Sequence, residues 1–183
     1  LTYRELWDQV ESTAGRLTAM GVVPGDRVAL LLPNLPEYLV ALHAIWLIGG
    51  TAVAASPLMA PAEIESLLAA TGSRVVVTLD LLAGLIPAGE SAPHSALVVT
   101  LGDRLPLLKR PGHALARFLR YSWGRPRGTT RWHDWGSAVG APPIGGSMTS
   151  TCSPEDPALI LPTGGTTGRP RAVVLCHRNL VAN

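Results

Sequence analysis

The sequence has few cysteines, few charged residues and almost no lysine. Its two cysteines, Cys152 and Cys176, form no CxxC pair, which argues against a disulfide scaffold and against a structural zinc site. Only 15% of the 183 residues are charged and 47% are hydrophobic, which excludes intrinsic disorder over the whole chain. The net charge of +2, with Lys109 as the single lysine, is too small to predict a nucleic-acid partner. The composition therefore indicates a globular domain with an apolar core.

A long apolar run, residues 38–57, approaches the ~20 residues that a membrane-spanning helix needs. It contains His43, Gly49, Gly50 and Ser56, and it divides naturally into a helix, a turn and a strand, so we favour a globular interpretation. No signal-peptide pattern opens the sequence, and a cytoplasmic location is expected. Because the sequence starts on Leu1 and stops as a new helix begins, we expect it to be a piece of a longer protein.

Helices and strands are predicted to alternate over the first hundred residues. Thr2 with Glu5, and Asn34 with Glu37, have the spacing of capping boxes, and Gly72 is placed to end a helix. Apolar spacing predicts helices over residues 2–20, 36–48, 61–71 and 81–86, and strands over 28–32, 51–55, 74–78 and 96–101. This alternation predicts an α/β fold of βαβ layers around a parallel sheet, in which ligands bind beyond the carboxyl ends of the strands.

The character of the chain changes near Gly102, which divides it into three parts. Residues 1–101 form the βαβ-rich part, 102–157 a variable insert rich in Arg, Trp and Pro, and 158–183 a hairpin followed by the start of a helix. A helix is predicted over residues 113–123, and we favour a solvated basic insert there. A peripheral contact of residues 113–135 with an anionic membrane surface is the second interpretation. Stacking of nucleic-acid bases on the tryptophans of this segment ranks lowest.

A polar loop, Pro162 to Arg171, lies between strands predicted over residues 158–161 and 172–175. Its glycines can expose backbone N–H groups, its threonines add hydroxyl donors and its arginines add positive charge, which together suit a polyphosphate. It matches neither the GxxxxGK[ST] nor the GxGxxG pattern. Composition alone also allows a glycine-rich hairpin that binds nothing.

The stretch from Thr163 to Arg171, with residues 173–180 after it, resembles the phosphate-binding signature of the adenylate-forming (AMP-binding) superfamily. That superfamily includes acyl-CoA synthetases, luciferases and non-ribosomal adenylation domains. The double glycine, Gly164-Gly165, is most similar to the long-chain fatty-acid–CoA ligase branch. Further similarities follow in the family's order at residues 1–6, 25–28, 32–34, 49–53 and 56–58. The resemblance covers residues 1–101 and 155–183 well and the middle only loosely.

The resemblance implies the N-terminal part of the large domain of such an enzyme. The implied reaction joins a carboxylic acid, here a fatty acid, to AMP from ATP and then to coenzyme A, with Mg²⁺ on the phosphates. The residues implied to bind ATP are Thr163, Gly164, Gly165, Thr166, Thr167, Gly168 and Arg171, with Arg171 also as the catalytic cation. No protein metal ligand is assigned. The family's remaining motifs lie downstream, so these residues alone are not expected to form a competent ligase.

Three positions depart from the family's pattern. Arg171 replaces the usual lysine, Ala172 a usual glycine and Pro162 a common aromatic residue. Arginine keeps the charge but is bulkier and planar, alanine is restricted where φ is positive, and proline removes an N–H. A non-catalytic remnant, or a nucleotide-binding module with a decayed phosphate loop, is therefore the alternative to an active ligase.

Overall fold

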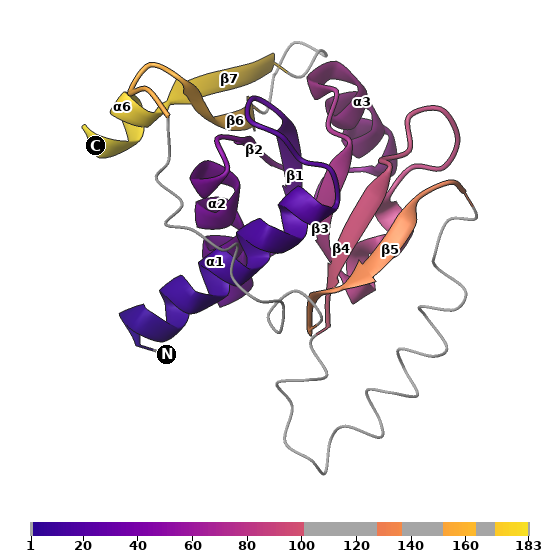
Figure 1. Cartoon of the computed structure of the whole chain (residues 1–183). Helices are drawn as coiled ribbons and strands as arrows, with labels where there is room; N and C mark the ends of the chain where they lie inside the picture. The colour runs from indigo at the N-terminus through magenta and orange to yellow at the C-terminus, as the bar shows by residue number, and fades with distance from the viewer. Residues whose placement is uncertain (1, 101–127, 137–151, 164–170, 183) are drawn as a thin grey trace.

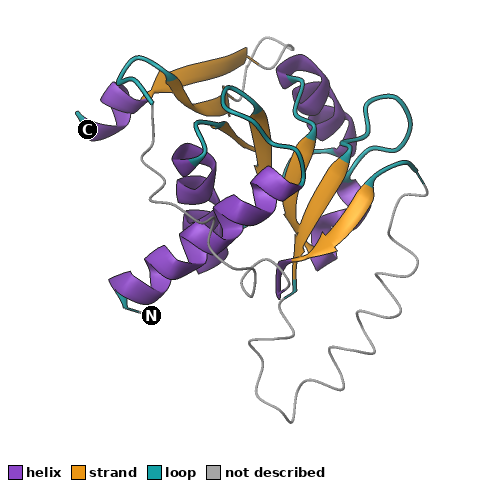
Figure 2. Cartoon of the chain, viewed as in Figure 1, coloured by secondary structure: helices purple, strands orange, loops and turns teal. Residues whose placement is uncertain are grey.

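A computed structural model of the chain describes residues 2–100, 128–136, 152–163 and 171–182. Helices and strands alternate over the first hundred residues, as the sequence predicted (Figures 1 and 2). The helices are α1 (Tyr3–Ala19), α2 (Pro36–Leu47), α3 (Pro61–Thr71), the 3₁₀ helix η1 (Asp80–Leu85) and α6 (His177–Val181). The strands are β1 (Arg27–Leu31), β2 (Thr51–Ala54), β3 (Val75–Leu79), β4 (Ser95–Val99), β5 (Arg131–Asp134), β6 (Pro157–Thr163) and β7 (Arg171–Cys176).

The strands of the described residues form one sheet of seven in the order β5-β4-β3-β1-β2-β6-β7. The first six are parallel to their neighbours, and β7 runs antiparallel to β6. The predicted parallel α/β sheet is thus confirmed, with one antiparallel strand at its edge. Because β1, β2 and β6 point the same way, Thr163 at the end of β6 lies at the carboxyl edge of the sheet.

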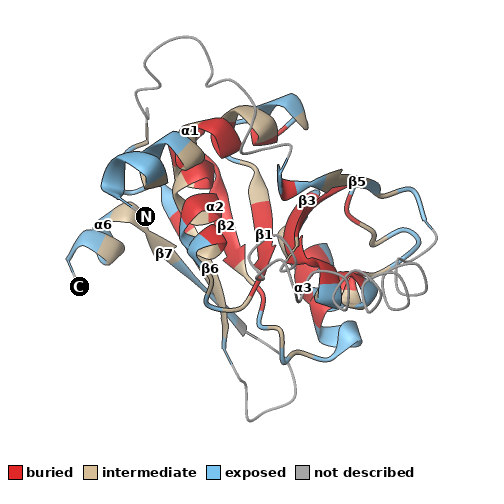
Figure 3. Ribbon diagram, turned by 90° about the horizontal axis from the view of Figure 1, so that it is seen from below, coloured by how far each residue is buried: buried red, intermediate tan, exposed pale blue. Residues whose placement is uncertain are grey.

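Helices cover both faces of the sheet. The helices α1 and α2 pack on one face and α3 packs on the other (Figure 3). Val28 and Leu30 of β1 belong to the core cluster under α1 and α2, whereas Ala29 and Leu31 belong to the cluster under α3. Successive side chains therefore enter opposite cores, which is why β1 is a continuous apolar run.

Two helix boundaries test the predicted caps. The capping box at Thr2 is confirmed, since the Glu5 N–H donates to Thr2 Oγ1 at 3.2 Å and the Thr2 N–H to Glu5 Oε2 at 2.7 Å. The predicted cap at Asn34 is wrong, because Leu35 is the N-cap of α2 and makes no side-chain capping bond. Pro36 is the first helical residue, and its missing N–H reduces the need for a cap there. Gly72 ends α3 in the left-handed conformation, with φ of 62°, as predicted.

The edge strand β5 was not predicted. It lies within the basic insert, pairs with β4 and is held to α1 where Arg16 Nη2 lies 3.0 Å from His133 Nδ1. The helix predicted over 81–86 is a 3₁₀ helix over Asp80–Leu85, and the helix predicted over 113–123 falls outside the described residues. Within the described ranges, no helix combines the length and the apolar character needed to cross a bilayer.

Candidate phosphate-binding hairpin

The candidate site is built on the antiparallel hairpin of β6 and β7. The strands predicted over 158–161 and 172–175 are confirmed, and both are longer than predicted. Thr163 closes β6, Arg171 opens β7, and the two residues are directly opposite each other in the register. Thr163 is exposed. The hairpin therefore brings the two ends of the candidate loop together at the carboxyl edge of the sheet, the edge at which open α/β folds bind ligands.

Five of the predicted site residues lie between those strand ends. Gly164, Gly165, Thr166, Thr167 and Gly168 fall outside the described residues. Thr163 and Arg171 are therefore the two predicted site residues whose backbone positions the structure gives. Both lie on the hairpin, so the structure brings together the two ends of the predicted loop.

The structure places two of the unusual residues opposite each other, since Pro162 pairs with Ala172. Ala172 lies in a strand, and none of the described non-glycine residues has a positive φ, so this position does not require glycine. Pro162 lies beyond Leu159 and Ile160, the residues of β6 that pair with β2, so its missing N–H removes no bond from that parallel ladder. The antiparallel pairing continues through both residues to Thr163 and Arg171.

A hollow of about 350 Å³ separates the hairpin from α3. Its walls include Met59 and Glu63 from the first half of α3 and its approach, and Pro162 and Ala172 from the hairpin. The hollow thus reaches the loop end of the hairpin. It offers space beside the loop and a wall that carries one carboxyl group, Glu63.

A second, larger groove lies at the opposite end of the hairpin, where β7 leads into α6. We call it the α2–α6 groove; its volume is about 580 Å³. Its lining residues are Trp7, His43, Trp46, Leu47, Cys152, Ser153, Pro154, His177, Arg178, Val181 and Ala182. Because Cys176 pairs with Pro157 at the start of β6, this groove is at the far end of the hairpin from Thr163 and Arg171.

The two histidines of this groove pack against Trp46, and one of them also makes a local hydrogen bond. His43 Nδ1 donates to the Leu39 carbonyl at 2.8 Å, which is an ordinary contact within a helix. His177 opens α6, and its ring meets Trp46 edge-on with centroids 5.8 Å apart. These contacts give both histidines a structural role.

Two residues that contact the hairpin were missed by sequence reasoning. Trp46 and Thr51 donate side-chain hydrogen bonds to the backbone of β6, more than one hundred residues further along the chain. Both lie in an apolar run, and only the indole N–H and the hydroxyl distinguish them from core residues. No local pattern in the sequence connects them to the hairpin.

Comparison with known proteins places the whole chain in one family. Residues 1–183 match the family model of the AMP-binding enzymes. The chain is 30% identical over 186 residues to a long-chain-fatty-acid–CoA ligase of Bacillus subtilis strain 168, covering 100% of this chain and 33% of that protein. It is 32% identical over 191 residues to the corresponding ligase of Escherichia coli O6:H1, again covering 100% and 33%.

A solved structure shows the same fold. The acyl-CoA synthetase of Brucella canis matches with a TM-score of 0.70 and 24% identity, over 100% of this chain and 29% of that one. The chain spans about a third of the length of the curated relatives it matches. Because the family model matches every residue from 1 to 183, this chain belongs to the AMP-binding enzyme family.

Proposed function

We propose that this chain supplies the phosphate-binding part of an enzyme that activates a carboxylic acid with ATP. In the first step the carboxylate attacks the α-phosphorus of ATP, which forms an acyl-adenylate and releases pyrophosphate. In the second step the thiol of coenzyme A attacks the acyl carbon, which forms a thioester and releases AMP. Membership of the family supports this reaction, and the placement of the hairpin supports the part that these residues play.

The observation that carries the proposal is the pairing of Thr163 with Arg171 at the carboxyl edge of the sheet. A loop that leaves and re-enters the sheet there can close over a polyphosphate held beyond the strands. In this proposal Thr163, Thr166 and Thr167 donate hydroxyl hydrogen bonds. Catalysis of this kind relies on positioning and on stabilisation of charge.

The remaining loop residues complete the phosphate site in this proposal. Gly164, Gly165 and Gly168 leave their N–H groups open to phosphate oxygens, and Arg171 supplies the positive charge. Mg²⁺ prefers oxygen ligands and usually keeps phosphate partners, so it would be held on the phosphate oxygens beside the threonine hydroxyls. There it would neutralise charge on the phosphates.

We propose a fatty acid as the acid substrate. The two bacterial relatives described above are named long-chain-fatty-acid–CoA ligases, and the double glycine at Gly164-Gly165 is similar to that branch. A cytoplasmic location suits such a substrate and cofactor set. Contact of residues 113–135 with a membrane surface stays a prediction, since most of that segment lies outside the described residues.

The second candidate function is a non-catalytic nucleotide-binding remnant. The arginine at position 171, where the family usually has lysine, is the observation that favours it. Arginine presents a planar fork of donors, whereas lysine presents a compact charge, so the exchange can misplace the cation at a phosphate. The experiment that separates the two functions therefore centres on this residue.

The test is ATP–pyrophosphate exchange, measured on the longest reading frame that contains this segment and with a panel of carboxylic acids. An active ligase exchanges pyrophosphate only when its acid is present, and the best acid reports the chain length of the substrate. Exchange that appears only in Arg171→Lys would indicate a site that has decayed at this residue. A well-folded protein without exchange in either form would support the remnant.

A further inference from the structure

Two consecutive carbonyl groups at the start of β6 each accept a hydrogen bond from a side chain of the neighbouring elements α2 and β2. Thr51 Oγ1 donates to the Pro157 carbonyl at 2.9 Å, and Trp46 Nε1 donates to the Ala158 carbonyl at 2.8 Å. Thr51 opens β2 and Trp46 is near the end of α2. Both donors therefore come from the central α/β part of the molecule and act on the base of the hairpin.

The hairpin needs such anchors because its backbone attachment to the sheet is short. Only Leu159 and Ile160 of β6 pair with β2, whereas β3 and β4 pair over five residues. The rest of β6 and the whole of β7 extend past this ladder as a two-stranded ribbon (Figure 1). Two-stranded ribbons are strongly twisted and marginally stable by themselves. The orientation of this ribbon therefore depends on contacts at its base.

The indole of Trp46 is itself held by two histidine rings. Its ring meets His43 at 5.2 Å and His177 at 5.8 Å, both edge-on, and the Cys152 thiol lies 3.6 Å from its carbonyl oxygen. His177 is the first residue after β7, so Trp46 contacts both β6, at Ala158, and the start of α6, at the shared base of the hairpin. These ring contacts hold the indole with its N–H toward the carbonyl of Ala158, which is fully buried.

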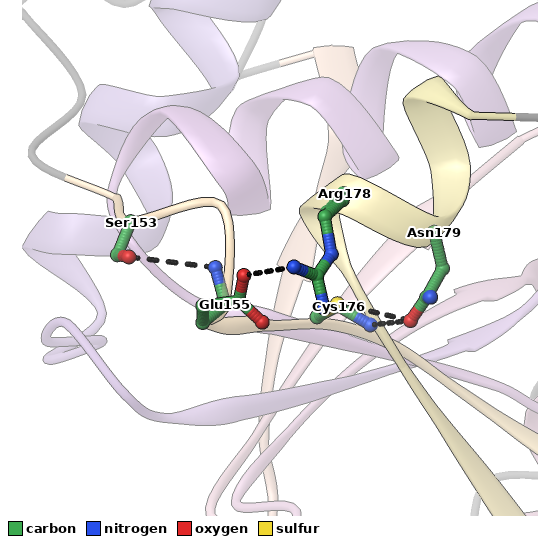
Figure 4. A network of polar contacts seen from close by, with 5 residues as sticks. All are labelled: Ser153, Glu155, Cys176, Arg178 and Asn179. Carbon is green, nitrogen blue, oxygen red and sulfur yellow. Dashed lines mark hydrogen bonds and ion pairs between the residues drawn. The ribbon is translucent and has the colours of Figure 1, made fainter.

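Other contacts at this base are local to the hairpin and its approach. Glu155 pairs with Arg178 at 2.8 Å, and the Cys176 N–H donates to Asn179 Oδ1 at 2.9 Å (Figure 4). The side chains of Glu155 and Arg178 are 60% and 65% exposed, and such ion pairs contribute little. Because neither contact reaches α2 or β2, neither can orient the hairpin relative to the sheet.

We propose that Trp46 and Thr51 are positioning residues that fix the tilt of the β6–β7 hairpin and so place the phosphate-binding loop. The inference rests on the proposed function of that loop. Thr163 is five residues beyond Ala158, which is roughly 17 Å of extended strand. A tilt of about 5° at the base would move the loop by about 1.5 Å, and displacements of that size are costly to catalysis.

Four variants of the longest reading frame test this role. Trp46→Phe removes the indole N–H and keeps an aromatic ring, and Thr51→Val removes the hydroxyl and keeps the shape. Trp7→Phe is the matched control, since Trp7 lines the same groove but its indole N–H donates to Glu11 within α1. Thr51→Ser restores the hydroxyl and is the rescue.

The kinetic readout separates positioning from a general loss of stability. One hydrogen bond is worth about 1 kcal/mol, so Trp46→Phe and Thr51→Val should each raise the KM for ATP in the exchange reaction about fivefold. The KM for the acid should stay within about twofold, because the hairpin is proposed to hold phosphates. Trp7→Phe and Thr51→Ser should match the wild type. Equal effects on both substrates, or no effect on ATP, would overturn the inference.

Hydrogen exchange of the peptides over β6 and β7 tests the anchoring without relying on activity. Faster exchange in Trp46→Phe and Thr51→Val, with β3 and α1 unchanged, would support it. Unchanged exchange in the hairpin, or faster exchange everywhere, would overturn it. A folded wild-type protein without ATP–pyrophosphate exchange would remove the proposed function and the ATP part of this inference, while hydrogen exchange would still decide the anchoring.

Discussion

The parallel centre of the sheet and the β6–β7 hairpin are built in different ways. Every residue of β3 and β4 is buried, whereas Val173 and Val174 of β7 are 43% and 56% exposed. The central strands pair on both sides over four or five residues, but β6 shares two register pairs with β2. Both regions belong to one sheet, yet among the described residues helices cover both faces of the centre only.

Because of this difference, the centre of the sheet provides most of the stability, and the hairpin carries the proposed phosphate site. Burial of apolar side chains on both faces stabilises the centre, since each buried valine or leucine contributes about 1.5–3 kcal/mol. The hairpin buries less apolar surface and carries a polar loop, which suits a segment that has to contact a ligand. Substitutions in the two regions should therefore affect different measurements.

The largest expected effect on stability is seen when a valine is replaced by alanine in the centre of the sheet and the result is compared with the same substitution in the hairpin. Val77→Ala, at a fully buried position of β3, should lower the free energy of unfolding by about 2 kcal/mol, because it removes buried methyl groups and leaves a cavity. Val174→Ala in β7 should lower it by less than about 0.5 kcal/mol. Urea titration of both variants measures the difference, and similar losses would contradict the division between centre and hairpin.

A smaller effect is expected at the turn between α3 and β3. Gly72 has a φ of 62°, and a Cβ there would lie 3.0 Å from Arg27 Nη2. Gly72→Ala should therefore lower the free energy of unfolding by about 1 kcal/mol through backbone strain. Gly136→Ala is the control, since nothing lies within 4 Å of a Cβ at that position. The outcome that argues against this account is an equal urea midpoint for the two variants.

The smallest expected effect depends on pH and concerns β5. Arg16 can only donate, so His133 Nδ1 accepts the hydrogen bond and the ring is neutral. Burial lowers the pKa of His133 below its usual 6.5, and Arg16 and Arg131 lower it further, while Asp134 opposes them. The unfolded chain therefore binds the proton more readily than the folded one.

The sign of the pH dependence follows from that difference. The contribution of neutral His133 to the free energy of unfolding is complete above pH 6.5, the ordinary pKa of histidine. It is lost as the pH falls through the lowered pKa of His133 in the folded state. His133→Gln should reduce the loss of stability on acidification, and His94→Gln, at an exposed position, should retain it. The same acid sensitivity in both variants would show that His133 is not responsible.

Much of the fold could be predicted because local signals agree with the global structure. Continuous apolar runs predicted the buried strands, and the Thr2 capping box and Gly72 predicted two helix boundaries that the structure confirms. The two strands around the Gly/Thr loop were predicted for the same reason. Because the two strands flank the loop in the sequence, their prediction was enough to place Thr163 and Arg171 at the ends of one loop.

The features that sequence reasoning missed depend on distant parts of the chain. The strand β5 has no apolar alternation, and it forms where Arg131–Asp134 can pair with the edge of β4 and Trp132 and Trp135 reach the two cores. The anchors of the hairpin, Trp46 and Thr51, act on carbonyl groups more than one hundred residues away. Such tertiary contacts leave no local pattern.

The most direct test of the account compares Arg171→Ala with Val77→Ala in the longest reading frame. The account predicts that the wild type catalyses fatty-acid-dependent ATP–pyrophosphate exchange, and that Arg171→Ala loses about 10²-fold of that rate with an unchanged urea midpoint. Val77→Ala should lower the midpoint and keep the rate under conditions where it is folded. A folded wild type without exchange, or an Arg171→Ala variant with full activity, would contradict the account.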